Sequence, residues 1–148
     1  MAIDLSREGM EAGKGGPFGC IIIKDGQVVG KGCNSVSSTN DPTAHAEIVA
    51  IKDACKNLGT FQLQGCEIYT SCEPCPMCLG AIYWARPDRV FYANDRKDAA
   101  AAGFDDDFIY RELNVSPENR KIPMLKFQLE EASQVFKEWE DLDNKTLY

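Results

Sequence analysis

One histidine and two cysteines of this 148-residue chain have the types and the spacing of zinc ligands. His45 is the only histidine, and Cys75 and Cys78 form a Cys-x-x-Cys pair. Three protein ligands leave the fourth tetrahedral position of a zinc ion open for water, which is the ligand count of a catalytic site. Glu47 stands two residues after His45 and is not needed as a ligand. Its carboxylate is therefore a candidate for moving protons to and from that water.

A closed structural zinc site is the alternative for these ligands. Structural sites hold four protein ligands, and Cys72 is a candidate fourth because Cys-x-x-Cys occurs at both 72–75 and 75–78. A closed site would leave Glu47 without a function, whereas an open site uses its carboxylate. The open, catalytic site is therefore the favoured interpretation.

The composition indicates one compact domain over residues 1–148. Hydrophobic residues make up 44% of the chain, which is enough for a core. The N-terminus lacks the basic start and apolar run of a signal peptide, and no apolar stretch is long enough to span a membrane. Seven cysteines are an odd number for a secreted disulfide framework, so we expect reduced thiols and a cytoplasmic location.

The charge of the chain favours a small, uncharged substrate. Its net charge is -7, and its densest basic groups, at Arg86, Arg89 and Arg96-Lys97, are interspersed with aspartates. Proteins that follow a phosphate backbone normally carry clustered Lys and Arg. The missing basic patch argues against a nucleic-acid partner.

Hydrophobic periodicity and turn residues predict alternating helices and strands. The predicted helices cover residues 3–12, 44–58, 77–84, 99–102, 107–112 and 133–143. The predicted strands cover residues 18–23, 28–33, 66–70, 89–93 and 124–129. Asp25-Gly26 predicts a tight hairpin between the first two strands, and residues 34–43 form a polar loop. This order predicts an α/β fold with a mixed sheet and helices on its faces.

Both metal motifs fall where a predicted helix begins. Cys75 and Cys78 are three residues apart and share one face of a first helical turn, where free N–H groups favour thiolates. His45 and Glu47 are two residues apart, which places them on opposite sides of a regular helix. They can share one site only if His45 lies at the frayed start of its helix and Glu47 reaches back.

Longer stretches of the chain carry a resemblance to a known family. The spacing of His45, Glu47, Cys75 and Cys78 matches the H-x-E…P-C-x-x-C signature of zinc nucleobase and nucleoside deaminases. The matching stretches are residues 15–19, 40–47, 70–86 and 102–106. Together with the terminal tyrosine, they make the chain resemble the bacterial guanine deaminases of the cytidine deaminase superfamily.

The resemblance implies a fold and a reaction. The fold is a cytidine-deaminase-like three-layer α-β-α sandwich with a central mixed sheet of about five strands. The reaction is the hydrolysis of guanine to xanthine and ammonia in purine catabolism or salvage, with one Zn²⁺ per chain held by His45, Cys75 and Cys78. Zinc activates a hydroxide, and Glu47 shuttles protons.

The resemblance also implies roles for residues outside the metal signature. Asn34 corresponds to a base-binding amide, and Asp106 to a second acid that accepts from the exocyclic amine and can carry a proton. Phe18 and Trp84 would cover the faces of the ring, although both are core residue types as well. Tyr148 would close the pocket. Members of this family also exchange C-terminal segments between subunits, which implies a homodimer.

Several alternatives stay open at this level. Asp106 lies within a run of three aspartates at 105–107, and the sequence does not decide which of them faces the pocket. The substrate of a deaminase with this signature could also be cytosine, guanosine or tRNA adenosine. A non-enzymatic zinc-binding module is the remaining class, and it has no use for the Glu47 carboxylate.

Overall fold

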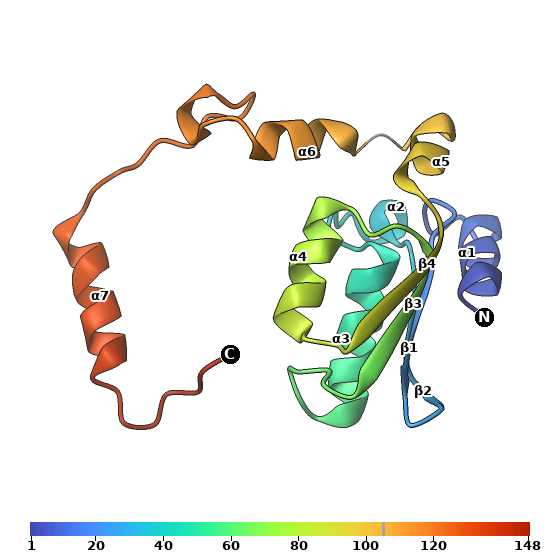
Figure 1. Cartoon of the computed structure of the whole chain (residues 1–148), viewed down its shortest axis with the longest axis horizontal. Helices are drawn as coiled ribbons and strands as arrows, with labels where there is room; N and C mark the ends of the chain where they lie inside the picture. Colours follow the sequence, from blue (N-terminus) through green and yellow to red (C-terminus); the bar gives the residue numbers. More distant parts are fainter. Residues whose placement is uncertain (105) are drawn as a thin grey trace. The chain divides into compact units, whose positions relative to one another are not determined.

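A four-stranded mixed sheet forms the centre of the fold in this computed structural model, which describes residues 1–104 and 106–148 (Figure 1). The strands are β1 (Gly19–Lys24), β2 (Gln27–Cys33), β3 (Cys66–Cys72) and β4 (Arg89–Asn94). Their order in the sheet is β2-β1-β3-β4. The β1–β2 and β1–β3 pairs are antiparallel, whereas β3 and β4 are parallel. The sheet is therefore mixed, as predicted.

The hairpin between β1 and β2 turns at Asp25-Gly26, as the sequence predicts. The φ angles of these residues are 49° and 74°, which are the left-handed values that a type I′ turn requires at both central positions. The strands pair Lys24 with Gln27, directly across the turn.

Helices cover both faces of the sheet in the unit Met1–Phe108. Figure 1 shows α1 (Ala2–Glu11) on one face, and α3 (Ala46–Leu58) and α4 (Pro76–Ala85) on the other. Successive residues of β1 face opposite helix layers. Cys20 and Ile22 are buried in the core with α3, whereas Gly19 lies against α1. This three-layer α-β-α arrangement confirms the predicted fold class.

Close contact between α3 and β2 sets the position of the N-terminal end of α3. A Cβ atom at Gly32 would overlap the carbonyl oxygen of Ala46 and crowd the backbone nitrogen of Ala50. Glycine at this position therefore lets the first turns of α3 lie directly on the sheet. Glu47, in the first of those turns, is buried as a result.

The remaining helices are short, apart from α7 in the second unit. They are α2 (Val36–Thr39), α5 (Arg96–Ala101), α6 (Asp107–Leu113), the 3₁₀ turn η1 (Pro117–Asn119) and α7 (Glu130–Glu140). The short helix α2 lies within the segment predicted as a polar loop. The second unit, Ile109–Tyr148, contains no buried residue among those the structure describes.

The predicted fifth strand over residues 124–129 is wrong. This segment has no regular secondary structure, so the sheet has four strands and not about five. An extended segment becomes a strand only when a neighbour pairs with its backbone groups, and within 109–148 no described segment does so.

None of the described helices is long and apolar enough to cross a bilayer. The assignment of residues 1–148 to one domain stays a prediction.

Candidate metal centre and active site

His45, Cys75 and Cys78 bring their ligand atoms together, within 4.8 Å of one another. The Nδ1 atom of His45 lies 3.6 Å from Sγ of Cys75 and 3.5 Å from Sγ of Cys78. Zn–S bonds of about 2.3 Å and a Zn–N bond of about 2.0–2.1 Å at the tetrahedral angle separate sulfur from nitrogen by about 3.5–3.6 Å. The distances between these side chains therefore fit a shared zinc ion.

The ends of two helices place these ligands. His45 is the N-cap of α3, and its ψ of 155° is extended and not helical. Cys75 is the N-cap of α4 with a ψ of 168°, Pro76 begins the helix, and Cys78 lies in the first turn. Because His45 precedes the regular helix, its side chain is free of helical periodicity and can share a site with Glu47. This is the arrangement at the start of α3 that the spacing required.

The two thiols differ in their affinity for protons. The hydrogen bond from Cys78 and the neighbouring His45 lower the pKa of Cys75 to about 4, so its thiolate is present at neutral pH. The same interaction raises the pKa of Cys78. A cysteine binds zinc as the thiolate, so loading the metal displaces the proton from Cys78. The pair is suited to a cation that neutralises both sulfurs.

Cys72 is not part of this cluster among the residues that the structure describes. Its thiol is buried and donates to the carbonyl oxygen of Asp95 at 3.5 Å. Burial raises the pKa of Cys72 to about 11, which keeps the thiol protonated. The three-ligand arrangement with an open fourth position is thus the one that the geometry favours.

Glu47 lies beside the ligands, with only 6% of its surface exposed. Its Oε2 atom accepts from Sγ of Cys78 at 3.5 Å, and its Oε1 atom accepts from the hydroxyl of Thr70 at 3.2 Å. Burial raises the pKa of the Glu47 carboxyl above its usual value. A carboxyl group with a raised pKa can hold a proton between two transfers, as general acid–base catalysis requires.

The Asn34 side chain is oriented by backbone donors. Its Oδ1 atom accepts from the N–H groups of Gly16 and Val36, each at 3.3 Å. Since both partners are donors, the oxygen must face them, and the amide nitrogen keeps its two hydrogens for other partners. A Cβ atom at Gly15 would overlap Oδ1. The neighbouring Ser35 N–H donates to the carbonyl of Ala44 at 2.9 Å, which brings this segment beside His45.

Phe18 packs edge to face against Phe104, with ring centroids 4.9 Å apart. Both rings line a small hollow of about 70 Å³. Ser71 and Cys72 also line it, and they precede the segment that carries Cys75 and Cys78. Asp106 is half-buried two residues beyond Phe104. Its charge adds to the hydrogen bond with Cys75 that raises the pKa of His45. Asp106 is thus near the cluster.

Comparison with known proteins accounts for this combination of residues. Residues 1–94 match the family described as the cytidine and deoxycytidylate deaminase zinc-binding region. The chain belongs to this deaminase family. The matched residues include the three candidate ligands and Glu47.

Two relatives resemble this deaminase over most of its length. The guanine deaminase of Bacillus subtilis (strain 168) is 56% identical over 147 residues, which cover 99% of this chain and 94% of that protein. The X-ray structure of guanine deaminase from Bacillus subtilis has a TM-score of 0.97 with this chain, at the same coverage. A tRNA-specific adenosine deaminase of Aquifex aeolicus (strain VF5) is 40% identical over 124 residues, or 83% of this chain and 79% of that protein.

A third relative is more distant. The structure of guanine deaminase from Nitrosomonas europaea has a TM-score of 0.68 and 33% identity, and the match covers 80% of this chain and 64% of that chain. These similarities, together with the His/Cys/Cys group, identify the chain as a member of the zinc-dependent deaminases.

The predicted site residues of the deaminase differ in how far they are exposed. Trp84 lies on α4 with 63% of its surface exposed, and Tyr148 is 69% exposed within the second unit. Asp107 begins α6 and is exposed, whereas Asp105 lies outside the described residues. The roles given to Phe18, Trp84, Tyr148 and the aspartates stay predictions.

Sequence reasoning missed Thr70, which contacts Glu47 directly. A signal for it was present in β3. The inward positions of this strand are Cys66, Ile68 and Thr70, so a hydroxyl occupies the third place in an otherwise apolar row. A buried hydroxyl needs a partner, and Glu47 is the nearer of the two acceptors around Thr70.

Proposed function

We propose that the chain hydrolyses guanine to xanthine and ammonia. The observation that carries this proposal is a buried Glu47 hydrogen-bonded to a member of the His45, Cys75 and Cys78 group, in a chain 56% identical to a guanine deaminase over 99% of its length. The net charge of -7 supports a free base over tRNA, the substrate named for the Aquifex relative.

Glu47 carries the protons in this proposal. When bound to the three ligands, zinc supplies hydroxide at neutral pH by lowering the pKa of water from about 15.7 to about 7. Glu47 accepts the proton of the attacking water and delivers it to N3 of the ring as C2 is attacked. It then helps to protonate the amino group that leaves C2 as ammonia. One carboxyl group thus acts first as base and then as acid.

Asn34 supports the choice of guanine over adenine. Its amide nitrogen is a donor that the backbone leaves for the ligand, because the oxygen already accepts two N–H groups. Guanine presents the acceptor O6 where adenine presents an amine. An unpaired buried polar group costs about 1–3 kcal/mol, so this donor selects against adenine. Asp106 would accept from the exocyclic amine of guanine, and Phe18 and Trp84 would cover the ring.

Ammonia release from four separate substrates tests the proposed function. Guanine, guanosine, cytosine and adenine are each offered to the zinc-loaded chain, with an adenosine-containing tRNA anticodon stem as a fifth arm. Guanine is expected to release ammonia at least about tenfold faster than the others, since one missing hydrogen bond corresponds to about that factor. Faster release from the tRNA arm would show that the substrate is tRNA adenosine and not guanine. No release from any arm would favour a non-enzymatic zinc-binding module.

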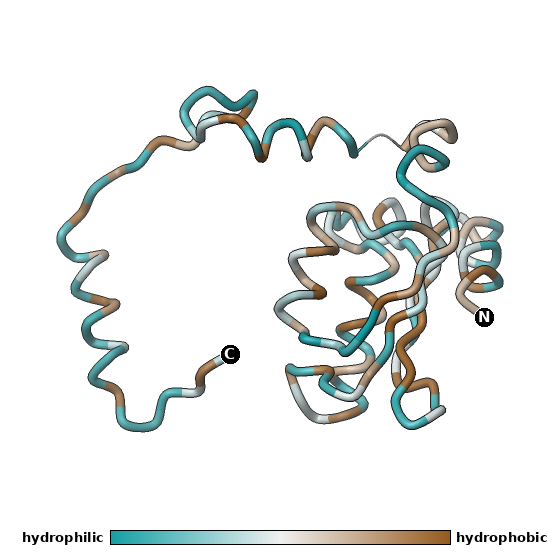
Figure 2. The backbone as a smooth tube through the Cα atoms, in the orientation of Figure 1, coloured by the Kyte–Doolittle hydropathy of each residue, from teal (hydrophilic) through white to brown (hydrophobic). Residues whose placement is uncertain are grey.

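The exposed apolar side chains of the second unit support the binding of a partner chain. Figure 2 shows hydrophobic residues recurring along α7 between hydrophilic ones. The large hydrophobic side chains of this helix, Val135, Phe136 and Trp139, are all exposed. Exposed apolar side chains grouped on one helix are a feature of interaction sites.

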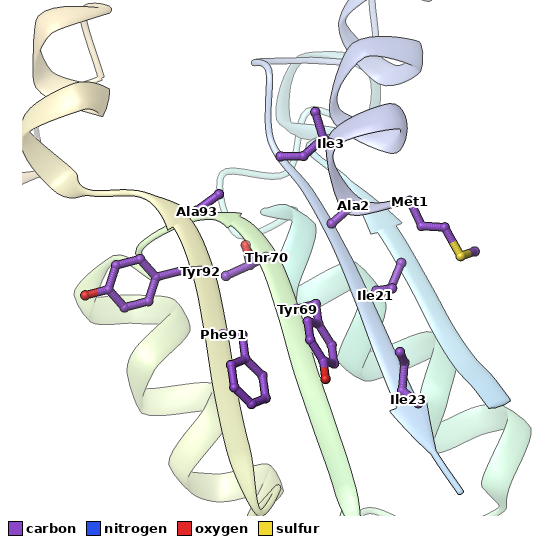
Figure 3. Close-up of a pocket in the computed structure, with 10 residues that line it drawn as sticks. All are labelled: Met1, Ala2, Ile3, Ile21, Ile23, Tyr69, Thr70, Phe91, Tyr92 and Ala93. Atoms are coloured by element: carbon purple, nitrogen blue, oxygen red, sulfur yellow. The ribbon is translucent and has the colours of Figure 1, made fainter. Parts of the chain in front are cut away.

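The first unit exposes apolar surface as well. A hollow of about 330 Å³ lies on the α1 face of the sheet, where the rings of Tyr69 and Phe91 stack with their centroids 4.8 Å apart. Figure 3 shows the side chains that line it. Ile21 and Ile23 of β1 line its other side. β4 is the edge strand beside this hollow.

We infer from these two surfaces that the chain works as a homodimer with exchanged C-terminal segments. The partner's segment would bury its apolar residues on the first unit. Tyr148 would help to seal a guanine-sized pocket, its own or its neighbour's. Such closure excludes water and leaves no room for a ribose at N9.

Removing residues 146–148 is expected to lower guanine turnover by more than about tenfold, because the pocket then stays open to water. Zinc should remain bound, since all three ligands lie before residue 79. Steady-state kinetics with zinc analysis measures both quantities. The variant Tyr148→Phe keeps the ring and separates its contribution from that of the hydroxyl. Full activity of the truncated chain, or of a sedimenting monomer, would contradict this proposal.

We also propose a cytoplasmic location. All seven cysteines lie in the described part of the chain, and each is a free thiol. Free thiols in this number are suited to a reducing compartment.

A further inference from the structure

A buried hydroxyl connects the sheet to the candidate proton carrier. Thr70 lies on β3 with 4% of its surface exposed. Its Oγ1 atom lies 3.2 Å from Oε1 of Glu47 and 3.5 Å from the carbonyl oxygen of Gly19. A hydroxyl has one hydrogen and two lone pairs, so it donates to one of these acceptors at a time. The shorter distance is that to the carboxylate.

Zinc binding would remove the hydrogen bond that Glu47 accepts from Cys78. In the structure the carboxylate also accepts from the thiol of Cys78, at 3.5 Å. A cysteine that binds zinc is a thiolate and has no hydrogen to donate. Thr70 is then the described side chain that still donates to Glu47, which otherwise keeps the contact with its own backbone N–H.

The residue type at position 70 also indicates a specific use. Valine has the same branched shape as threonine and would continue the apolar row of Cys66 and Ile68 without a polar group to satisfy. Threonine adds only the hydroxyl. That hydroxyl points to Glu47, a buried carboxylate beside the ligands.

We propose that Thr70 is a positioning residue that holds the Glu47 carboxylate in its working orientation through one O–H···O hydrogen bond. The proposal rests on the proposed function, because it assigns Thr70 to the proton transfers of that same reaction. Gly19 provides a second acceptor for the Thr70 hydrogen. The hydroxyl can therefore keep a hydrogen bond with the carboxyl group whether Glu47 accepts or donates, and Thr70 itself neither gains nor loses a proton.

Substitutions at position 70 of the zinc-loaded chain test the proposal. In Thr70→Val, kcat for guanine is expected to fall about tenfold to a hundredfold, the loss that corresponds to one hydrogen bond to a charged group. KM should stay within about twofold, because Thr70 acts through Glu47 and not on the base. Thr70→Ser restores the hydroxyl and should recover most of kcat. Zinc content should remain one per chain in each variant.

A control on the same face of β3 separates positioning from packing. Ile68→Val removes one buried methylene group two residues away and should lower the melting temperature without changing kcat. If Thr70→Val does not fold, Thr70→Ala and Thr70→Ser make the comparison, since they differ only in the hydroxyl. Equal kcat values for these two, or an unchanged kcat in Thr70→Val, would overturn the proposal.

Failure of the proposed function gives a different result. If the proposed function is wrong, the unsubstituted chain releases no ammonia from guanine, and this is seen before any variant is compared. Failure of the Thr70 proposal appears only in the variants, against an active unsubstituted chain.

Discussion

Replacing Glu47 by glutamine is expected to lower guanine turnover by about 10²–10⁴-fold, the range that general acid–base catalysis contributes. Glutamine keeps the size and polarity of the side chain but cannot accept the proton of the attacking water. The upper part of the range is expected because one carboxyl group serves several proton transfers in succession. Single-turnover and steady-state kinetics on the zinc-loaded variant measure the effect.

The fold and the metal should be unaffected by Glu47→Gln. Glu47 contacts Cys78 but is not a member of the ligand group, so zinc should stay at one per chain. Glu67→Gln is a matched control, because that carboxylate pairs with Arg89 at 3.0 Å on β3 and β4 and should leave kcat unchanged. Retention of most activity by Glu47→Gln would mean that another group carries the protons.

Replacing Cys75 by alanine is expected to reduce bound zinc from one ion per chain to almost none and to abolish turnover. A site with three protein ligands becomes one with two, and the thiolate that is lost is the one already ionised at neutral pH. Metal analysis of the purified chain gives the zinc content. Treatment of the unsubstituted chain with a chelator should cause the same loss of activity, and added zinc should restore it.

Cys72→Ser is the control that separates an open site from a closed one. Cys72 lies on the same short segment but donates to the backbone of Asp95 and is outside the ligand group. Serine keeps that donor, so zinc and activity should both remain. Zinc loss in Cys72→Ser, or full activity of a metal-free chain, would refute a three-ligand catalytic site.

Local sequence determined the ligand types and most elements of the first unit. Asp25-Gly26 specified the hairpin because both positions need positive φ, and the Cys-x-x-Cys spacing placed Cys75 and Cys78 on one turn of α4. The strands and helices followed from periodicities of two and of 3.6 residues, which are properties of a short window. The prediction failed at residues 124–129. A strand there needs a second strand to pair with, and a short stretch of sequence does not show whether one is present.

The tertiary structure decided how the chemistry is assembled. His45 and Glu47 share a site because the chain enters α3 in an extended conformation at His45, and Thr70 reaches Glu47 only because α3 lies on the sheet. The orientation of the Asn34 amide depends on backbone N–H groups as far as 18 residues away in sequence. Residue types and spacings therefore determined which reactive groups this protein has, because these belong to individual side chains and single turns. The packing of segments that are distant in sequence decided which of these groups are in contact. Each contact requires two elements to lie at the right distance, and the packing of the whole core sets that distance.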